Sequence, residues 1–149
     1  MQIEIININN IPENKKLKSL LGDEVYEFHK LLSGIIVDKL NPDIEIWDDG
    51  GRRGKYFHGY RINKIKLIIN LYLLCVNGEG LLKCELELSK LIVNKLLQNK
   101  DKFSASTQKN LQSIISNKKE HGSYFLEIRI SNSDTFEDMQ YLIELLAVG

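Results

Sequence analysis

The residues best suited to chemistry lie in one short run, Gly50–Arg61, which combines cations, glycines and aromatic side chains. Guanidinium groups grip phosphate through two parallel hydrogen bonds, glycines let backbone N–H groups approach an anion, and aromatic rings stack on bases. This combination predicts an anion-binding or nucleic-acid-binding site. The residues that we expect to contact such a partner are Arg52, Arg53, Lys55, Tyr56, His58, Tyr60, Arg61, Lys64 and Lys66.

The same run also fits a solvated hairpin tip whose aromatic side chains point into the core, because basic-aromatic clusters are short motifs that often occur without function. No acid occurs from Gly50 to Lys66. We therefore expect the most positive surface patch to be an exposed edge formed by Arg52, Arg53, Lys55 and Arg61. One-to-one pairing of these cations with acids such as Asp48 would remove the case for an anionic partner.

Charge is distributed unevenly along the chain. Residues 50–119 hold fourteen Lys or Arg against four Asp or Glu. Residues 1–49 hold ten acids and five bases, residues 120–149 hold six acids and one base, and the formal net charge is +0. Such asymmetry indicates an anionic partner, either nucleic acid or an acidic protein surface, or internal pairing. The neutral total argues against a dedicated DNA-binding protein.

Carboxylates supply a weaker candidate for catalysis. Glu85 and Glu87, with Asp48 or Asp49 upstream, imitate the carboxylates of a two-metal nuclease. The two glutamates alternate with apolar residues, however, which already explains them as the solvent face of a strand.

Histidines and cysteines give no recognisable site. His29, His58 and His121 show no metal-ligand spacing with Cys75 or Cys84. We interpret the cysteines as core packing and His29 as a partly exposed residue beside a helical stripe. The chain also lacks a phosphate-binding loop, a nucleophile elbow and a zinc motif. We therefore expect no catalytic residues, no metal and no cofactor, and lean against an enzyme while leaving a weak activity open.

Hydrophobic periodicity predicts a single α+β domain over residues 1–149: an antiparallel β-meander of about five to six strands with helices packed on one face. We expect strands near residues 3–8, 44–49, 55–62, 64–76, 82–88 and 124–130. We expect helices over residues 23–40, 90–99, 106–118 and 134–146. The strand over 64–76 should be central, with its second half buried on both faces.

Local signals fix several boundaries. Asp23 is expected to cap the first helix and Ser89 the second, while Asp134 with Glu137 forms a capping box for the last. In the hairpin over residues 64–90, a type II′ turn at Gly78-Glu79 or a longer loop would place Cys75 opposite Leu82. We then expect both cysteines to be reduced and buried.

Composition sets the class of protein. With 149 residues, 43% hydrophobic and 27% charged, the chain is typical of a globular domain. Its longest apolar stretch, Leu67–Val76, is interrupted by Asn70 and is too short for a bilayer. The first residues lack a basic signal region, and two cysteines fit a reducing compartment. We expect a cytoplasmic protein with no membrane partner, and the oligomeric state stays open.

Two parts of the chain resemble a known group of proteins. His121–Ser131 and Asp134–Leu146 resemble the end of a group of small uncharacterised bacterial domains, which finish with a His-Gly loop, a Glu-x-Arg-Ile-Ser strand and an acid-rich helix. Tyr56–Arg61, followed by the apolar strand, is similar to their middle portion. Some of those domains are fused to restriction-type nucleases. The resemblance implies an α+β fold and a link to nucleic-acid or defence systems, implies no catalytic residues, and does not extend to Gly50–Gly54 or Leu91–Lys109.

The leading interpretation is therefore a non-enzymatic macromolecule-binding protein that uses the basic-aromatic hairpin and a basic central face, in nucleic-acid-linked defence, counter-defence or an accessory role in bacteria or phage. The first alternative is a protein–protein inhibitor or immunity protein, in which charged faces set specificity and on-rate. The minor alternative is a metal-dependent nuclease. Affinity for nucleic acid as a function of salt separates these classes, because binding through phosphates weakens steeply with salt.

Overall fold

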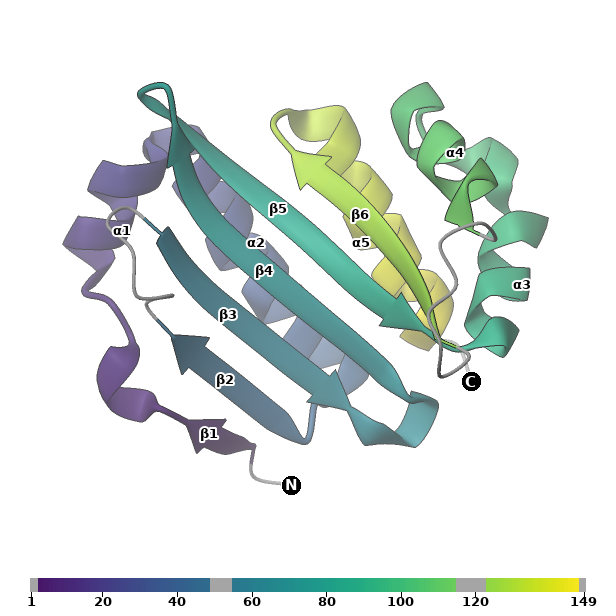
Figure 1. Cartoon of the computed structure of the whole chain (residues 1–149), viewed down its shortest axis with the longest axis horizontal. Helices are drawn as coiled ribbons and strands as arrows, with labels where there is room; N and C mark the ends of the chain where they lie inside the picture. Colours follow the sequence, from purple (N-terminus) through teal and green to yellow (C-terminus); the bar gives the residue numbers. More distant parts are fainter. Residues whose placement is uncertain (1–2, 49–54, 115–122, 148–149) are drawn as a thin grey trace.

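The computed structural model describes residues 3–48, 55–114 and 123–147, and in these residues it has one six-stranded sheet with the strands in sequence order (Figure 1). The fold is α+β, as predicted. The strands are β1 Glu4–Ile6, β2 Ile44–Asp48, β3 Lys55–Ile62, β4 Leu67–Val76, β5 Glu79–Leu88 and β6 Tyr124–Ile130. The α-helices are α1 Asn14–Leu21, α2 Asp23–Leu40, α3 Lys90–Gln98, α4 Ala105–Gln112 and α5 Ser133–Ala147.

The meander is antiparallel from β2 to β6, but β1 pairs with β2 in parallel, with Glu4 opposite Ile44. The predicted antiparallel meander is therefore confirmed, and β1 adds one parallel strand at its edge. The chain passes through α1 and α2 between the two strands, and a helical crossover of this kind returns the chain to the same end of the sheet, which allows parallel pairing.

One face of the sheet packs against helices. Figure 1 shows α2 and α5 behind the strands, and alternate residues of β4 from Leu67 to Leu73 are fully buried on that side. The residues between them, from Ile68 to Leu74, remain partly exposed. The expectation that the second half of β4 is buried on both faces was therefore wrong. None of the described helices is long and apolar enough to cross a membrane.

The α3–α4 pair lies beside the β6 edge (Figure 1). The Asn110 side chain donates from Nδ2 to the backbone carbonyl of Glu127 at 2.9 Å, and thereby satisfies an edge carbonyl of β6. Predicted residues 115–118 of this helix lie outside the described part of the chain, as does the tip of the β2–β3 hairpin at residues 49–54.

Helix ends follow the sequence signals in part. Helix α2 spans the predicted residues, but Gly22, with φ of 80°, precedes it and Asp23 is already helical. Ser89 caps α3 as expected, because its Oγ accepts from the Ile92 N–H at 3.4 Å. At α5 the predicted Asp134 cap is wrong: the Asn132 side-chain oxygen accepts from the Thr135 N–H at 3.0 Å.

Helix α1 was not predicted, and it is held close to the β4–β5 hairpin. A Cβ at Gly80 would lie 1.9 Å from the Leu21 carbonyl oxygen, so this contact requires glycine. Leu17 and Leu21 bury the inner side of α1.

The β4–β5 hairpin turns at Asn77-Gly78, not at Gly78-Glu79. Both turn residues have positive φ, 54° and 80°, as a type I′ turn requires. Leu73 therefore lies opposite Leu82, and the exposed Cys75 opposite Gly80. The expected odd-to-even pairing is confirmed, but the register differs by two residues and the expectation that Cys75 is buried was wrong. Cys84 is buried, both thiols are free, and burial raises the pKa of the Cys84 thiol.

Candidate functional site

Strand β3 separates the predicted binding residues onto two faces, because successive side chains of a strand point in opposite directions. His58 and Tyr60 are each 1% exposed and lie in the core on the helix side. We expected both residues at a partner-binding surface, but the structure places them in the core. Tyr56 shares their side by alternation, while Lys55 and Arg61 lie on the opposite side, which we call the open face.

The remaining predicted cations do not gather with them into one edge. Lys64 and Lys66 are exposed, but Lys64 lies in the short turn Asn63–Ile65 between β3 and β4 and Lys66 directly follows it, at the end of β3 away from Lys55. Arg61 is only partly exposed, and its Nη1 donates to Asn70 Oδ1 at 3.1 Å. Arg52 and Arg53 lie outside the described residues.

The four described cations of this set are not paired one-to-one with carboxylates of the described residues. Among the described residues, no ion pair joins a carboxylate to Lys55, Arg61, Lys64 or Lys66. That observation keeps the case for an anionic partner open.

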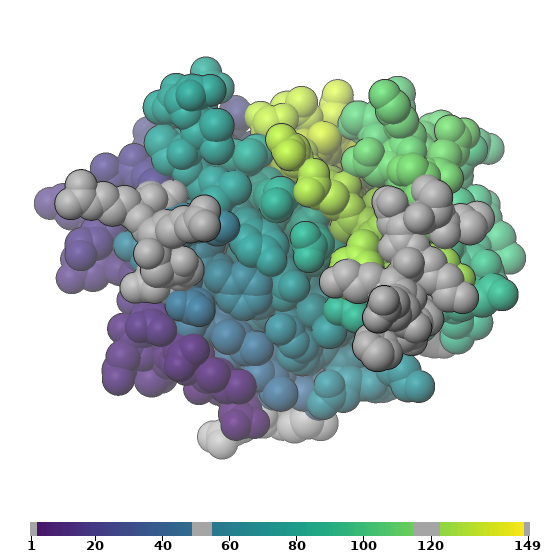
Figure 2. All heavy atoms as spheres, in the orientation of Figure 1, coloured from purple at the N-terminus to yellow at the C-terminus, as the bar shows by residue number. Residues whose placement is uncertain are grey.

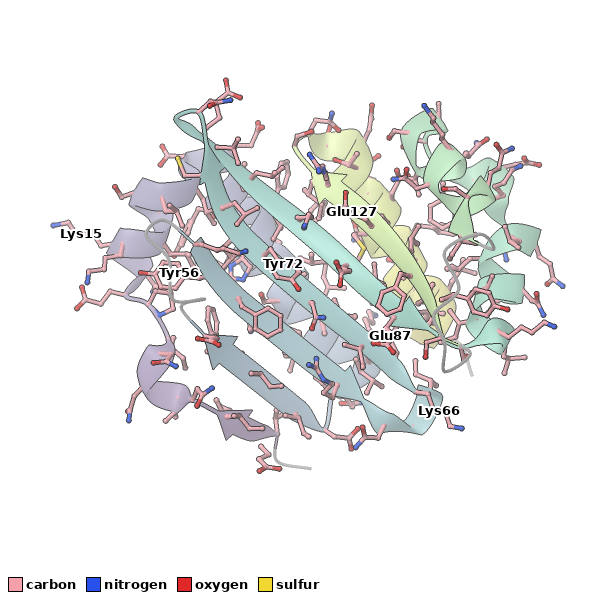
Figure 3. The ribbon with its side chains drawn as sticks, in the orientation of Figure 1. Lys15, Tyr56, Lys66, Tyr72, Glu87 and Glu127 are labelled. Carbon is pink, nitrogen blue, oxygen red and sulfur yellow. The ribbon has the colours of Figure 1, made fainter. Side chains whose placement is uncertain are left out.

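Register on the open face assembles a set of residues that sequence inspection did not find. Phe57 lies opposite Tyr72, Tyr72 opposite Lys83, and Lys83 opposite Arg129. Directly opposed residues project from the same face of a sheet, so these four form a line across β3–β6, which we call the aromatic–cationic row. Figure 3 shows Tyr72 in the middle of the sheet, on the side turned away from α2 and α5.

The centre of the row is an aromatic pair beside lysines. The rings of Phe57 and Tyr72 meet edge to face, with centroids 5.4 Å apart. The Nζ atoms of Lys55 and Lys83 lie 5.6 Å and 5.0 Å from the Tyr72 ring centroid. In Figure 2 the side chains of β3, β4 and β5 form the middle of the visible surface. The rings are partly exposed, and two ammonium groups lie within reach of one of them.

Carboxylates border the row on the same face. Glu127 bonds Arg129 Nε through Oε2 at 3.0 Å, and its Oε1 lies 3.8 Å from Lys83 Nζ. Glu85 and Glu87 follow along β5, and Figure 3 shows Glu87 and Glu127 on the open face. The pKa of Tyr72 is raised by partial burial and, to a smaller extent, by Glu85. No group of three metal-binding side chains occurs among the described residues, so the nuclease alternative gains no support here.

A second cluster lies on the helix side of β2 and β3, where α2 contributes His29 and Ser33. His29 Nε2 lies 3.0 Å from His58 Nδ1, and His58 Nε2 lies 2.6 Å from Glu45 Oε2. We call Glu45, His58 and His29 the histidine relay. Trp47 stacks on the His58 ring with centroids 3.7 Å apart. His29 is 5% exposed, so the expectation that it is partly exposed was wrong.

Hydrogen bonds and burial fix the protonation of the relay. Donation by His58, with smaller contributions from Trp47 and Tyr60, lowers the pKa of Glu45. Burial lowers the pKa of His58 and lowers that of His29 to about 3. At neutral pH, Glu45 is therefore anionic and both imidazoles are neutral.

This charge state determines the tautomers. His58 must donate from Nε2 to the Glu45 carboxylate, so its Nδ1 accepts from the Nε2–H of His29. His29 Nδ1 is then a hydrogen-bond acceptor. Ser33 Oγ lies 3.4 Å from His29 Nε2, but that nitrogen already carries a proton and cannot take one from the hydroxyl. The relay therefore does not activate Ser33 as a nucleophile.

The aromatic–cationic row and the histidine relay are identified from strand pairing and side-chain distances alone. Strand β6 and helix α5 correspond to the strand and helix of the resemblance noted in the sequence, which remains a prediction. No protein-family model, curated protein or solved structure matches the chain.

Proposed function

We propose that this chain is a non-enzymatic protein that binds single-stranded nucleic acid across the aromatic–cationic row. The observation that supports the proposal is the register that aligns Phe57, Tyr72, Lys83 and Arg129 across four neighbouring strands. Strands lie about 4.8 Å apart, so the row extends over roughly 14 Å. Sheet-based RNA-binding modules stack two or three unpaired bases on such a surface.

The chemistry of the row suits a single strand rather than a duplex. Phe57 and Tyr72 offer rings to bases, which can stack only when they are unpaired. Lys55 and Lys83 lie beside the Tyr72 ring, Arg129 ends the row on β6, and all three supply charge for phosphates. Arg53 precedes Lys55 by two residues in the chain and adds to the local positive charge of the sequence.

The second candidate is a protein–protein inhibitor or immunity protein. The observation that favours it is the set of partly exposed apolar side chains on the same face, which are Ile44, Ile46, Ile68, Leu74 and Leu81. A protein partner would cover these residues and use the bordering charges for specificity. A role in bacterial or phage defence, counter-defence or an accessory function belongs to either candidate and rests on the sequence resemblance.

Removing the charge of Glu127 is expected to strengthen binding. Glu127 pairs with both cations at the end of the row, so a Glu127→Gln variant leaves Lys83 and Arg129 available to phosphates. A partly exposed ion pair contributes up to about 1 kcal/mol, which corresponds to an affinity gain of roughly threefold at low salt. The measurement is fluorescence anisotropy of a labelled decameric oligothymidylate.

Glu137→Gln is the matched control, because it removes one acid from an exposed position on α5. Its affinity should remain close to that of the wild type. An equal gain in affinity in both variants would show that net charge alone explains the effect. If none of the proteins binds the oligonucleotide measurably, the proposed function is contradicted.

A further inference from the structure

A pocket of about 230 Å³ lies on the helix side of β2 and β3, on the face of the sheet away from the aromatic–cationic row. The histidine relay forms part of its wall, together with Tyr26 and Lys30 from α2, Trp47 from β2 and the segment that leads into α1. The volume is below the roughly 300–1,000 Å³ of pockets for drug-sized ligands, so the space suits a small metabolite.

Two acceptor atoms of the relay are available to a ligand. The described donors to Glu45, which come from Trp47, His58 and Tyr60, all reach Oε2 and leave Oε1 without a partner among the described residues. His29 Nδ1 is also unpaired among them, although His29 is only 5% exposed. No buried side-chain nitrogen or oxygen of the described residues lacks a partner, so both atoms border accessible space.

The charge of the wall selects the kind of ligand. Glu45 is the one carboxylate among the described lining residues, and it is ionised because its hydrogen-bond donors favour the charged form. Lys30 also lines the pocket and is exposed, so its ammonium group can turn to solvent. An anionic ligand would meet the negative charge of Glu45, whereas a cation with N–H groups would satisfy Glu45 Oε1. The aromatic side chains of Tyr26, Trp47 and Tyr60 favour a flat body that carries the cation.

We propose that this pocket binds a small organic cation of the amidine or guanidine class, which donates N–H groups to Glu45 Oε1. An ionised carboxylate with one oxygen unpaired among the described residues can accept charge-assisted hydrogen bonds from the N–H groups of an amidinium. The site is independent of nucleic-acid binding, since it lies on the other face of the sheet.

Three isosteric probes separate charge from shape: benzamidine, a cation; benzamide, which is neutral; and benzoate, an anion. Trp47 is the single tryptophan of the chain and lines the pocket, so its fluorescence reports occupancy. We expect a saturable change with benzamidine at neutral pH and an affinity at least tenfold higher than for the other two. Equal or tighter binding of benzoate, or no saturable change with any probe, would overturn the proposal.

A Glu45→Gln variant should reduce benzamidine affinity at least tenfold, with circular dichroism used to verify the fold. Glu27→Gln, which removes an exposed acid from the same helix as His29, should leave the affinity unchanged. An equal loss in both variants would contradict direct binding by Glu45. If Glu45→Gln does not fold, the order of the three probes on the wild type decides the question. Oligothymidylate binding, measured in parallel on the same proteins, tests the nucleic-acid proposal independently of the pocket proposal.

Discussion

A Phe57→Ala/Tyr72→Ala variant should lose about a hundredfold in affinity for oligothymidylate. Stacking of a base on an aromatic side chain contributes about 1–3 kcal/mol, and a loss of roughly 3 kcal/mol for two rings corresponds to about two orders of magnitude. Both side chains are partly exposed on the open face, so their truncation should leave the fold intact. Anisotropy of the labelled oligonucleotide measures the loss, and circular dichroism verifies folding.

The control for this variant is Leu74→Ala/Leu81→Ala. These two leucines oppose each other on the same face, are partly exposed and carry no ring. Their truncation removes apolar surface without removing stacking, so affinity should change by less than about threefold. An equal loss in the two double variants would favour apolar docking of a protein, and full affinity in the aromatic variant would contradict stacking.

Acid should unfold this protein through the histidine relay. His29 has a pKa of about 3 in the fold against an ordinary value of 6.5, and the pKa of His58 is lowered as well. Below pH 6.5 the unfolded chain binds protons at these sites and the folded chain does not, so the free energy of unfolding falls as the pH falls. The slope is about 1.4 kcal/mol per pH unit for each such group.

Neighbouring charges act in the same direction or do not titrate in this range. Glu45 has a lowered pKa, so its contribution to stability is present above about pH 4.5 and is lost as the pH falls through its folded value. The pKa of Tyr60 is raised, so its hydroxyl stays neutral in this range. Between pH 6.5 and 4.5, His29 therefore reduces the free energy of unfolding by up to about 2.7 kcal/mol. The lowered pKa of His58 adds to this fall, which is a substantial part of the stability of a typical domain.

Urea unfolding between pH 8 and pH 4.5, followed by Trp47 fluorescence and by circular dichroism, measures this dependence. A His29→Gln variant should show a smaller slope than the wild type, because one of the two buried imidazoles is absent. A wild-type free energy of unfolding that stays level between pH 7 and pH 5 would show that the relay histidines are not buried in their neutral forms.

Local sequence patterns predicted most helices and strands. They did not predict which residues of neighbouring strands lie opposite each other. Alternation in β5 correctly assigned Glu85 and Glu87 to the open face. The expected turn at Gly78-Glu79 would have placed Tyr72 opposite Glu85, whereas the turn at Asn77-Gly78 places it opposite Lys83. Since Asn-Gly is the preferred type I′ sequence, that signal was present in the chain. The row therefore depends on one turn type.

The relay lay beyond what sequence patterns reveal, for a different reason. Residues His29 and His58 are 29 positions apart, on a helix and on a strand, and their contact exists only after α2 has packed on the sheet. The alternation of β3 does predict that His58 and Tyr60 share a face, and the predicted hairpin with β2 brings Glu45 opposite Tyr60. Side-chain hydrogen bonds between them require the tertiary structure, which periodicity does not supply.

Binding of single-stranded nucleic acid is tested most directly by the affinity of the wild-type protein for decameric oligothymidylate across a series of salt concentrations, with polyglutamate as a competitor. Contacts from Lys55, Lys83 and Arg129 to three phosphates predict a slope of about −2 in a plot of log affinity against log salt, at roughly −0.7 for each phosphate. Polyglutamate carries similar charge without bases and should compete poorly, since it cannot stack on Phe57 and Tyr72. No binding at low salt, or equal competition by polyglutamate, would contradict the proposed function and favour an acidic protein partner.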